Sequence, residues 1–177
     1  MSELYLIAIG SNARVPGIGD PRLVVAAAFE ALEAQGMAVL ARGTIIDSAP
    51  IGPSLRRYAN SACVVESALS PPELLRRLQS LEHSFGRTRN QRRGQRWRAR
   101  ALDLDIILWS GGVWASPDLT IPHREMRGRD FVLGPASAIA GHWRDPVSGL
   151  SLAHLRARLS RKQRGPQKQR APTPAKG

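Results

Sequence analysis

Two aspartates, Asp103 and Asp105, interrupt an apolar run that otherwise has the character of a buried β-strand. Residues two apart on a strand share one face of the sheet, so both carboxylates point the same way. Neighbouring carboxylates repel each other unless a cation lies between them or one of them is protonated. A hard divalent ion such as Mg²⁺ suits the pair, because it takes one or two carboxylates together with phosphate oxygens and waters. The alternative is a structural pair bonded to loop amides or to arginine.

Seven arginines lie in the segment 87–100, directly before these aspartates. Such a segment is commonly a solvated face or a nucleic-acid patch, but here a predicted helix and the aspartate-bearing strand hold its two ends near the carboxylates. Arginines around a phosphate chain, with Mg²⁺ on acidic groups, are typical of phosphoryl transfer. Gly86 and Gly94 would allow the segment to close over a nucleotide, and Trp97 would stack on a base or anchor the closed lid.

Other polar residues are less specific on their own. Glu82 falls inside the apolar stripe of a predicted helix and Gln79 at its border, which is compatible with a site role or with a structural pairing. His123 follows a proline in a predicted loop, without a second histidine at helical spacing, and Cys63 is the single cysteine, so zinc is not indicated. The sequence also lacks the P-loop, the glycine-rich dinucleotide motif and the serine nucleophile elbow.

The elements that must position these groups follow the order β-α-β-β-α-β. Asp20 before Pro21 predicts a helix start, and Ser70 with Glu73 forms a capping box at a second start. This order predicts an α+β, ferredoxin-like fold with an antiparallel sheet, helices on one face and extra C-terminal helices. Strands are expected at 4–10, 37–47, 58–69 and 101–109, core helices at 20–35 and 70–84, and a closing amphipathic helix at 151–160.

Length, charge and cysteine content favour one soluble domain. A chain of 177 residues buries a core without disulfides, and a lone cysteine fits a reducing compartment. No run approaches the roughly 20 apolar residues of a membrane span, so the predicted location is cytoplasmic. Much of the net charge of +12 lies in the segment 160–177, which has no acidic residue and is expected to be a disordered, basic tail after a domain at 1–159.

Five segments together resemble hydroxymethyldihydropterin pyrophosphokinase in order and approximate spacing: "AIGSN" (8–12), "SAPIGP" (48–53), "YANSA" (58–62), "RWRARALDLDIIL" (96–108) and "IPHREMRGRDFVLGP" (121–135). The resemblance covers roughly residues 4–158. It implies transfer of diphosphate from ATP to 6-hydroxymethyl-7,8-dihydropterin, with release of AMP, in folate biosynthesis. It also implies two Mg²⁺ ions and small-molecule substrates, and we expect a monomer with no membrane or specific nucleic-acid partner.

The resemblance carries roles onto individual residues. Asp103 and Asp105 match the metal pair, and Asp105 is also placed among the catalytic groups. Tyr58 and Phe131 match the residues that sandwich the pterin ring. The remaining matches are Arg87, Arg96 and Arg100 for catalysis, Gln79, Arg89, Trp97, Ile106, Thr120, His123 and Arg129 for the ATP site, and Ser48, Ile51 and Asn60 for the pterin pocket.

The chain also departs from the family pattern. Arg98-Ala99 stands where Gly-Pro is frequent, and the arginine-rich loop is about three residues longer than in short relatives. Asp118, Arg124 and Ala49 replace a basic group, an aromatic residue and a proline. Two other readings follow: a catalytically weakened relative, or a basic RNA- or single-strand-binding module. The second predicts exposed aromatic residues on the strands, which are few here, and leaves the aspartate pair without a purpose.

Overall fold

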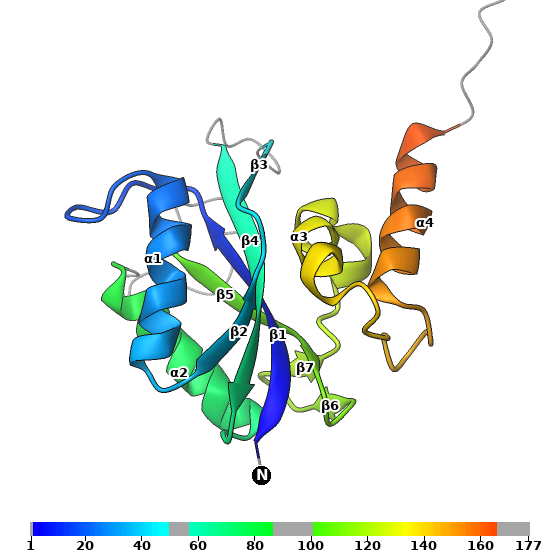
Figure 1. Cartoon of the computed structure of the whole chain (residues 1–177), viewed down its shortest axis with the longest axis horizontal. Coiled ribbons are helices and arrows are strands. Elements are labelled where there is room, and N and C mark those ends of the chain that lie inside the picture. Colours follow the sequence, from blue (N-terminus) through cyan, green and yellow to red (C-terminus); the bar gives the residue numbers. More distant parts are fainter. Residues whose placement is uncertain (1, 50–56, 87–100, 166–177) are drawn as a thin grey trace, which may run out of the picture.

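An antiparallel sheet forms the middle of the fold, and helices lie on both of its faces (Figure 1). The computed structural model describes residues 2–49, 57–86 and 101–165. The strands run in the order β2-β4-β1-β5, as expected for the split βαβ arrangement, and β3 pairs with the first residues of β4. They are β1 (Glu3–Ser11), β2 (Ala38–Arg42), β3 (Ile46–Ser48), β4 (Tyr58–Ser67) and β5 (Asp103–Trp109). The predicted ferredoxin-like α+β core is confirmed.

Helices α1 (Pro21–Ala34) and α2 (Pro71–Ser84) cover one face, and both begin where the sequence predicts. The Asp20 carboxylate accepts hydrogen bonds from the amides of Arg22 and Leu23, at 2.9 and 3.1 Å. At the start of α2, the amide of Ser70 donates to the Glu73 carboxylate at 2.9 Å. These caps satisfy backbone groups that the first turn of a helix leaves without partners, and so they set both helix boundaries.

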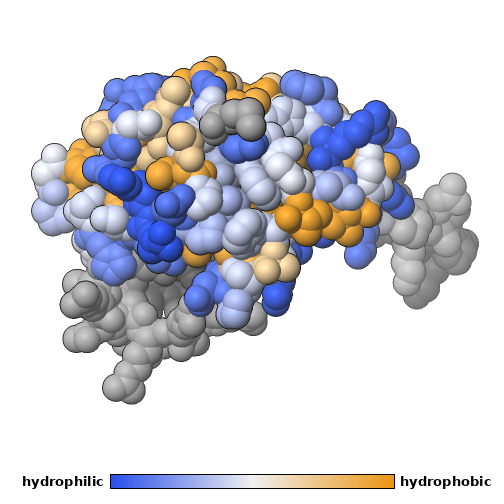
Figure 2. All heavy atoms as spheres, turned by 90° about the horizontal axis from the view of Figure 1, so that it is seen from below, coloured by the Kyte–Doolittle hydropathy of each residue, from blue (hydrophilic) through white to orange (hydrophobic). Residues whose placement is uncertain are grey.

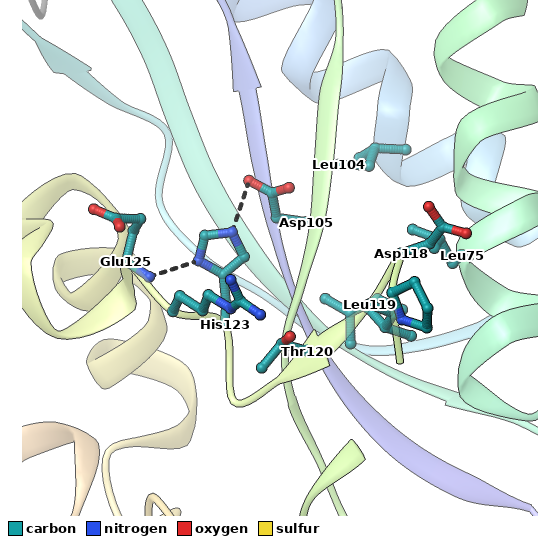
Figure 3. A pocket seen from close by; sticks show the side chains of 11 residues that line it. Leu75, Leu104, Asp105, Asp118, Leu119, Thr120, His123 and Glu125 are labelled. Carbon is teal, nitrogen blue, oxygen red and sulfur yellow. Dashed lines mark hydrogen bonds and ion pairs between the residues drawn. The ribbon is translucent and has the colours of Figure 1, made fainter. Parts of the chain in front are cut away.

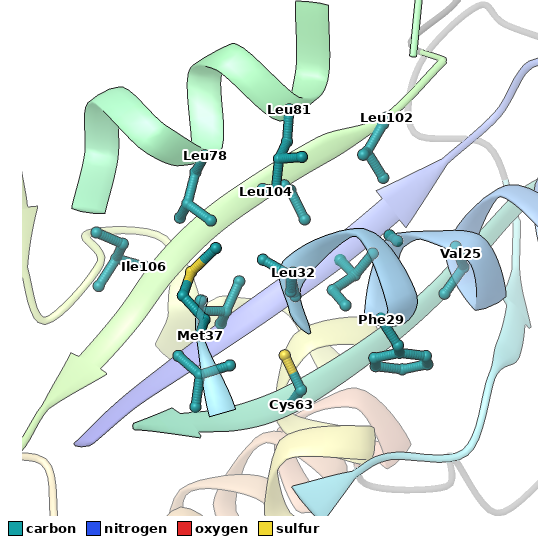
Figure 4. Packing of buried hydrophobic residues seen from close by; sticks show 14 of the residues in the cluster. Val25, Phe29, Leu32, Met37, Cys63, Leu78, Leu81, Leu102, Leu104 and Ile106 are labelled. Atoms are coloured by element: carbon teal, nitrogen blue, oxygen red, sulfur yellow. The ribbon is translucent and has the colours of Figure 1, made fainter. Parts of the chain in front are cut away.

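The core between these helices and the sheet is continuous (Figure 4). Leu32 of α1 and Leu78 of α2 are fully buried, and they meet alternate residues of the strands, such as Ile7 and Cys63. Burial raises the pKa of the Cys63 thiol to about 12, although the positive charge of Arg42 acts to lower that pKa. Period-3.6 stripes on the helices therefore meet period-2 faces on the strands, as the sequence pattern requires.

The opposite face of the sheet is covered as well, which makes the fold three-layered (Figure 1). Its cover consists of the short helix η1 (Met126–Gly128) and helices α3 (Asp130–Ala140) and α4 (Leu152–Arg164). The prediction of helices on one face thus holds for α1 and α2, and the expected C-terminal helices supply the second layer. Helix α4 ends four residues later than predicted, so residues 160–164 are helical, and the rest of the expected tail from 166 lies outside the described residues.

The strand expected at 37–47 is two strands, β2 and β3, separated at Gly43–Ile45. The amide of Gly43 donates to the carbonyl of Ala62 at 2.8 Å, and the Ser61 hydroxyl donates to the carbonyl of Gly43 at 2.8 Å. A Cβ at position 43 would stand 2.9 Å from the Ala62 carbonyl oxygen. The residue that ends β2 here is followed by a glycine whose backbone approaches β4 more closely than a residue with a side chain would allow.

A buried ion pair fastens the C-terminal layer. Both carboxylate oxygens of Asp145 accept bonds from the guanidinium of Arg127, each at 2.7 Å, and the Asp145 side chain is fully buried. The Ser148 hydroxyl and the amide of Val147 donate to the same carboxylate. The pair therefore links the turn before α4 to η1, from which the chain continues into α3.

Two short strands, β6 (Trp114–Ala115) and β7 (Thr120–Ile121), form a hairpin beside β5. The peptide bond between Ile121 and Pro122 is cis. On the face in Figure 2, apolar patches lie apart from one another among hydrophilic side chains. In the parts of the chain that the structure describes, no helix combines the length and the apolar character needed to cross a membrane.

Candidate functional site

Asp103 and Asp105 lie at the beginning of β5 and share one face of the sheet. Asp103 pairs with Gly10 of β1 and Asp105 with Ala8, whereas Leu104 between them pairs with Ile9 and turns into the α1/α2 core. Ala8 belongs to the core of the opposite face, so both carboxylates lie on the α3 side. Helix α3 packs mainly against β4, two strands away from β5, and the Asp105 side chain is 39% exposed. The predicted same-face arrangement of the two aspartates is confirmed.

The polar row continues across the sheet. Asn60 of β4 pairs with Gly10, the residue that also pairs with Asp103, so Asn60 and Asp103 stand on either side of a residue without a side chain. The Asn60 amide nitrogen donates to the Ser48 hydroxyl of β3 at 2.8 Å. A Cβ at Gly10 would lie 3.4 Å from the Asn60 oxygen. Glycine at position 10 therefore leaves the sheet surface open between the amide and the first aspartate.

His123 faces Asp105 from the segment after β7 (Figure 3). Its amide donates to the carbonyl of Ile107 at 3.0 Å, which fixes this segment along β5. The ring Nδ1 accepts a bond from the amide of Glu125 at 3.2 Å, and Nε2 lies 4.0 Å from an Asp105 carboxylate oxygen. Because Nδ1 is an acceptor, a neutral ring carries its proton on Nε2, the atom directed at Asp105.

A cleft of about 360 Å³ opens beside Asp105 and His123. Its walls come from α2, β5 and the segment 117–125 (Figure 3). Ile106 and Thr120, both predicted for the ATP site, line it. It is also lined by Leu75, Leu104, Pro117, Asp118, Leu119, Arg124 and Glu125.

The cleft includes residues that the sequence did not assign to a site. Leu75 lies one helical turn before Gln79, so the helix period could have indicated it. Glu125 contributes its backbone amide to His123, which residue type cannot signal. Asp118 and Arg124, noted only as departures from the family pattern, both line the cleft. These two departures therefore lie in the cleft itself.

Other predicted residues that the structure describes do not line the cleft. Gln79 is exposed on α2 and does not line the cleft. The guanidinium of Arg129 lies 5.8 Å from the ring centre of Phe131, at the beginning of α3. Tyr58 is half-buried on β4, two residues before Asn60, so its side chain shares the α3 face of the sheet with Asn60. The predicted Ile51, Arg87, Arg89, Arg96, Trp97 and Arg100 lie outside the described residues.

The acidic and histidine side chains of the site limit which metal it could hold. Within the described ranges, no group of three or more His, Cys, Asp or Glu side chains is arranged to hold one. Two same-face carboxylates nevertheless suit Mg²⁺, which keeps several waters and completes its shell with substrate phosphates rather than with a full set of protein ligands. Asp103 and Asp105 are the residues that fit this chemistry.

Comparison with known proteins agrees with this architecture. The family model described as 7,8-dihydro-6-hydroxymethylpterin-pyrophosphokinase (HPPK) matches residues 6–141. A solved Plasmodium falciparum HPPK-DHPS structure with pteroate is similar at a TM-score of 0.68 and 10% identity, over 93% of this chain and 44% of that chain.

Two curated relatives are named 2-amino-4-hydroxy-6-hydroxymethyldihydropteridine pyrophosphokinase. The one from Synechocystis sp. is 41% identical over 108 residues, which are 61% of this chain and 53% of the relative, so the match spans about half of that protein. The one from Pseudomonas aeruginosa is 34% identical over 148 residues, which are 82% of this chain and 86% of the relative. Because the family model covers most of its length, the chain belongs to the 7,8-dihydro-6-hydroxymethylpterin-pyrophosphokinase family.

Proposed function

We propose that the chain transfers diphosphate from ATP to the hydroxymethyl group of 6-hydroxymethyl-7,8-dihydropterin in folate biosynthesis. A bond forms between the hydroxymethyl oxygen and the β-phosphorus, and the bond from that phosphorus to the oxygen of the α-phosphate breaks. AMP and a proton leave. The observation that carries the proposal is the same-face pair Asp103 and Asp105, of which Asp105 lines a cleft together with His123.

Asp103 and Asp105 would hold two Mg²⁺ ions in this proposal. Bound there, Mg²⁺ would supply positive charge to the phosphates and lower the pKa of the attacking hydroxyl. The nucleotide occupies the cleft in this proposal, because Ile106 and Leu75 offer apolar walls while Thr120 and His123 offer polar groups. The Nε2–H of His123 points into the same region as the carboxylates and would donate to a phosphate oxygen.

The pterin would lie on the α3 side of the sheet. Asn60 and Ser48 are already hydrogen-bonded to each other, which orients the amide for a flat heterocycle with donors and acceptors on its edge. Gly10 leaves room beside them, and Tyr58 and Phe131 would stack on the two ring faces. The arginines of the segment 87–100 and Trp97 complete the proposal as groups that contact phosphate and exclude water.

The remaining expectations stay proposals. We propose that the chain is a cytoplasmic monomer. We also propose that it acts on small molecules without a specific nucleic-acid partner, because the acidic pair and the cleft suit a nucleotide and a metal. The sequence predicts that the catalytic unit ends at residue 159; because α4 continues to Arg164, we propose that the unit extends to the end of this helix, followed by the rest of the basic segment.

The test is AMP formation from ATP, Mg²⁺ and the pterin alcohol, followed by chromatography. We expect turnover in the native chain and a loss of at least a hundredfold in Asp105→Asn, which keeps size but removes the charge. Glu30→Gln is the matched control, because it removes a carboxylate from the exposed side of α1. The proposal is wrong if the native chain forms no AMP with Mg²⁺ or Mn²⁺, or if Asp105→Asn matches the control.

A further inference from the structure

Glu82 is a buried carboxylate whose position no catalytic step above explains. It lies on α2, only 3% exposed, on the same helical face as Leu78 and Leu81. Burying a carboxylate among apolar side chains is unfavourable unless hydrogen bonds compensate. One such bond is clear: the amide of Leu104 donates to Glu82 Oε1 at 2.9 Å. The acceptor therefore bonds the Asp103–Leu104 peptide unit, which lies between the two aspartate side chains.

The direction of this amide gives the bond its significance. In the described sheet, β5 pairs with β1 on one side, and α2 packs beside it. Along an antiparallel pair, successive residues alternate between directing their backbone groups toward the partner strand and away from it. Since the Leu104 amide points away from β1 to Glu82, the backbone groups of Asp103 and Asp105 are directed toward β1. Glu82 and β1 thus form hydrogen bonds to opposite sides of the stretch 103–105.

The stretch is also fixed through its side chains and its beginning. Leu104 is 4% exposed, and its side chain lies beside Leu81 and Leu102 in the core under α2 (Figure 4). The Ser11 hydroxyl donates to the carbonyl of Ala101 at 2.6 Å, where the chain turns into β5. Rotation of the Asp103–Leu104 peptide unit would change the direction of the Asp103 side chain relative to that of Asp105, and the Glu82 bond opposes that rotation.

We infer that Glu82 is a positioning residue: by holding the Leu104 amide it keeps the Asp103 and Asp105 carboxylates on one face, in position for the divalent cations. The inference rests on the proposed function, because it assumes that these aspartates bind the metal. Mg²⁺ demands near-ideal octahedral geometry, so a small rotation of one ligand matters. Groups that orient metal ligands typically change metal affinity by about 10- to 100-fold when they are removed.

Two conservative variants separate this role from a direct effect of the Glu82 charge. Glu82→Gln removes the charge but keeps an oxygen at the same distance, which can accept the Leu104 bond. Glu82→Asp keeps the charge but withdraws the acceptor by about 1.5 Å, one carbon–carbon bond. A positioning role predicts that Asp is the damaging change, whereas a direct charge effect predicts that Gln is. Glu73→Gln, at the exposed beginning of α2, is the control for helix stability.

The measurement is Mn²⁺ binding in the presence of a non-hydrolysable ATP analogue, followed by electron paramagnetic resonance. Hydrogen exchange of the Leu104 amide, followed by NMR on the same proteins, reports the bond itself without any turnover. We expect Glu82→Asp to weaken Mn²⁺ binding about tenfold and to lose protection of the Leu104 amide. Glu82→Gln should stay within about threefold of the native affinity and keep most of that protection.

The inference is overturned if Glu82→Gln loses as much Mn²⁺ affinity as Glu82→Asp, or if both bind like the native chain. Should Glu82→Asp fail to fold, a tenfold loss in Glu82→Gln would still overturn it, and retained affinity with a protected Leu104 amide would support it. A native chain that binds the Mn²⁺–nucleotide but forms no AMP would refute the proposed activity and leave the positioning role to the binding data. A native chain that binds no Mn²⁺–nucleotide would overturn both.

Discussion

Replacing Asp145 by Asn tests how the C-terminal layer is fastened to the part of the chain that carries Arg129 and Phe131. Asn keeps the volume and one acceptor oxygen, but it loses the charge and the second oxygen of the fork with Arg127. A hydrogen bond to a charged group contributes about 1.5–3 kcal/mol, and Arg127, about a third exposed, regains part of that from water. We therefore expect a loss of about 2–3 kcal/mol in the free energy of unfolding, or roughly 5–10 °C in Tm.

Urea unfolding monitored by circular dichroism provides the number, with Asp47→Asn as the control. Asp47 forms an exposed pair with Arg22 at 3.3 Å, so its loss should cost no more than about 0.5 kcal/mol. In a double-mutant cycle with Arg127→Met, the two changes should cost at least about 1 kcal/mol less together than separately. Additive costs, or a cost for Asp145→Asn no larger than for Asp47→Asn, would show that the ion pair does not hold this layer.

The stability lost in Asp145→Asn should also depend on pH. Burial alone would raise the pKa of Asp145, but hydrogen bonds from Arg127, Ser148 and the Val147 amide outweigh it and hold that pKa below its usual value. The folded chain thus binds fewer protons than the unfolded chain in acid, where the reference pKa is about 3.9. The stability difference between the native chain and Asp145→Asn should be constant from about pH 5 to 8 and shrink as the pH falls below about 4 through the folded pKa. A difference that grows in acid would contradict this sign.

Three further predictions concern separate features. Gly43→Ala should cost about 1–3 kcal/mol in urea unfolding, because its Cβ would meet the Ala62 carbonyl at 2.9 Å, whereas Gly128→Ala, with no atom within 4 Å, should stay within about 0.5 kcal/mol; equal costs would refute the close-approach argument. The Cys63 thiol, with its pKa raised to about 12 by burial, should not react with a disulfide reagent at pH 8 until the chain unfolds, and rapid reaction of the folded chain would count against its burial. Tyr58→Ala should raise KM for the pterin about five- to tenfold while Tyr58→Phe leaves it nearly unchanged, and equal KM values in both would exclude stacking on this ring.

Local chemistry explains why the core elements could be predicted from the sequence. The Asp20 carboxylate and the capping box of Ser70 bond groups only two or three residues away in the chain, so the helix starts can be predicted from the local sequence. The spacing of Asp103 and Asp105 likewise decides their common face through strand geometry alone.

The features that were not predicted depend on contacts between distant segments. The break between β2 and β3 accompanies the close approach of Gly43 to Ala62, and the Arg127–Asp145 pair joins residues whose types are common on any surface. The second helical layer could be predicted only as extra helices, because their apolar faces do not say which side of the sheet they cover. The sequence predicted only some of the residues that line the cleft, for the same reason. The segment 117–125 is held along β5 by the backbone bond from His123 to Ile107, which residue type does not encode.

The outward side of β5 has a consequence for association between molecules. A strand at the margin of a sheet offers unpaired amides and carbonyls, and another chain can add to them as a further strand. Here the Leu104 amide is taken by Glu82 and the Ile107 carbonyl by the amide of His123. The two groups that hold the aspartates and the histidine in place also occupy the hydrogen-bonding positions that strand addition would use. Along this margin, the geometry of the site and resistance to edge-to-edge aggregation depend on the same bonds.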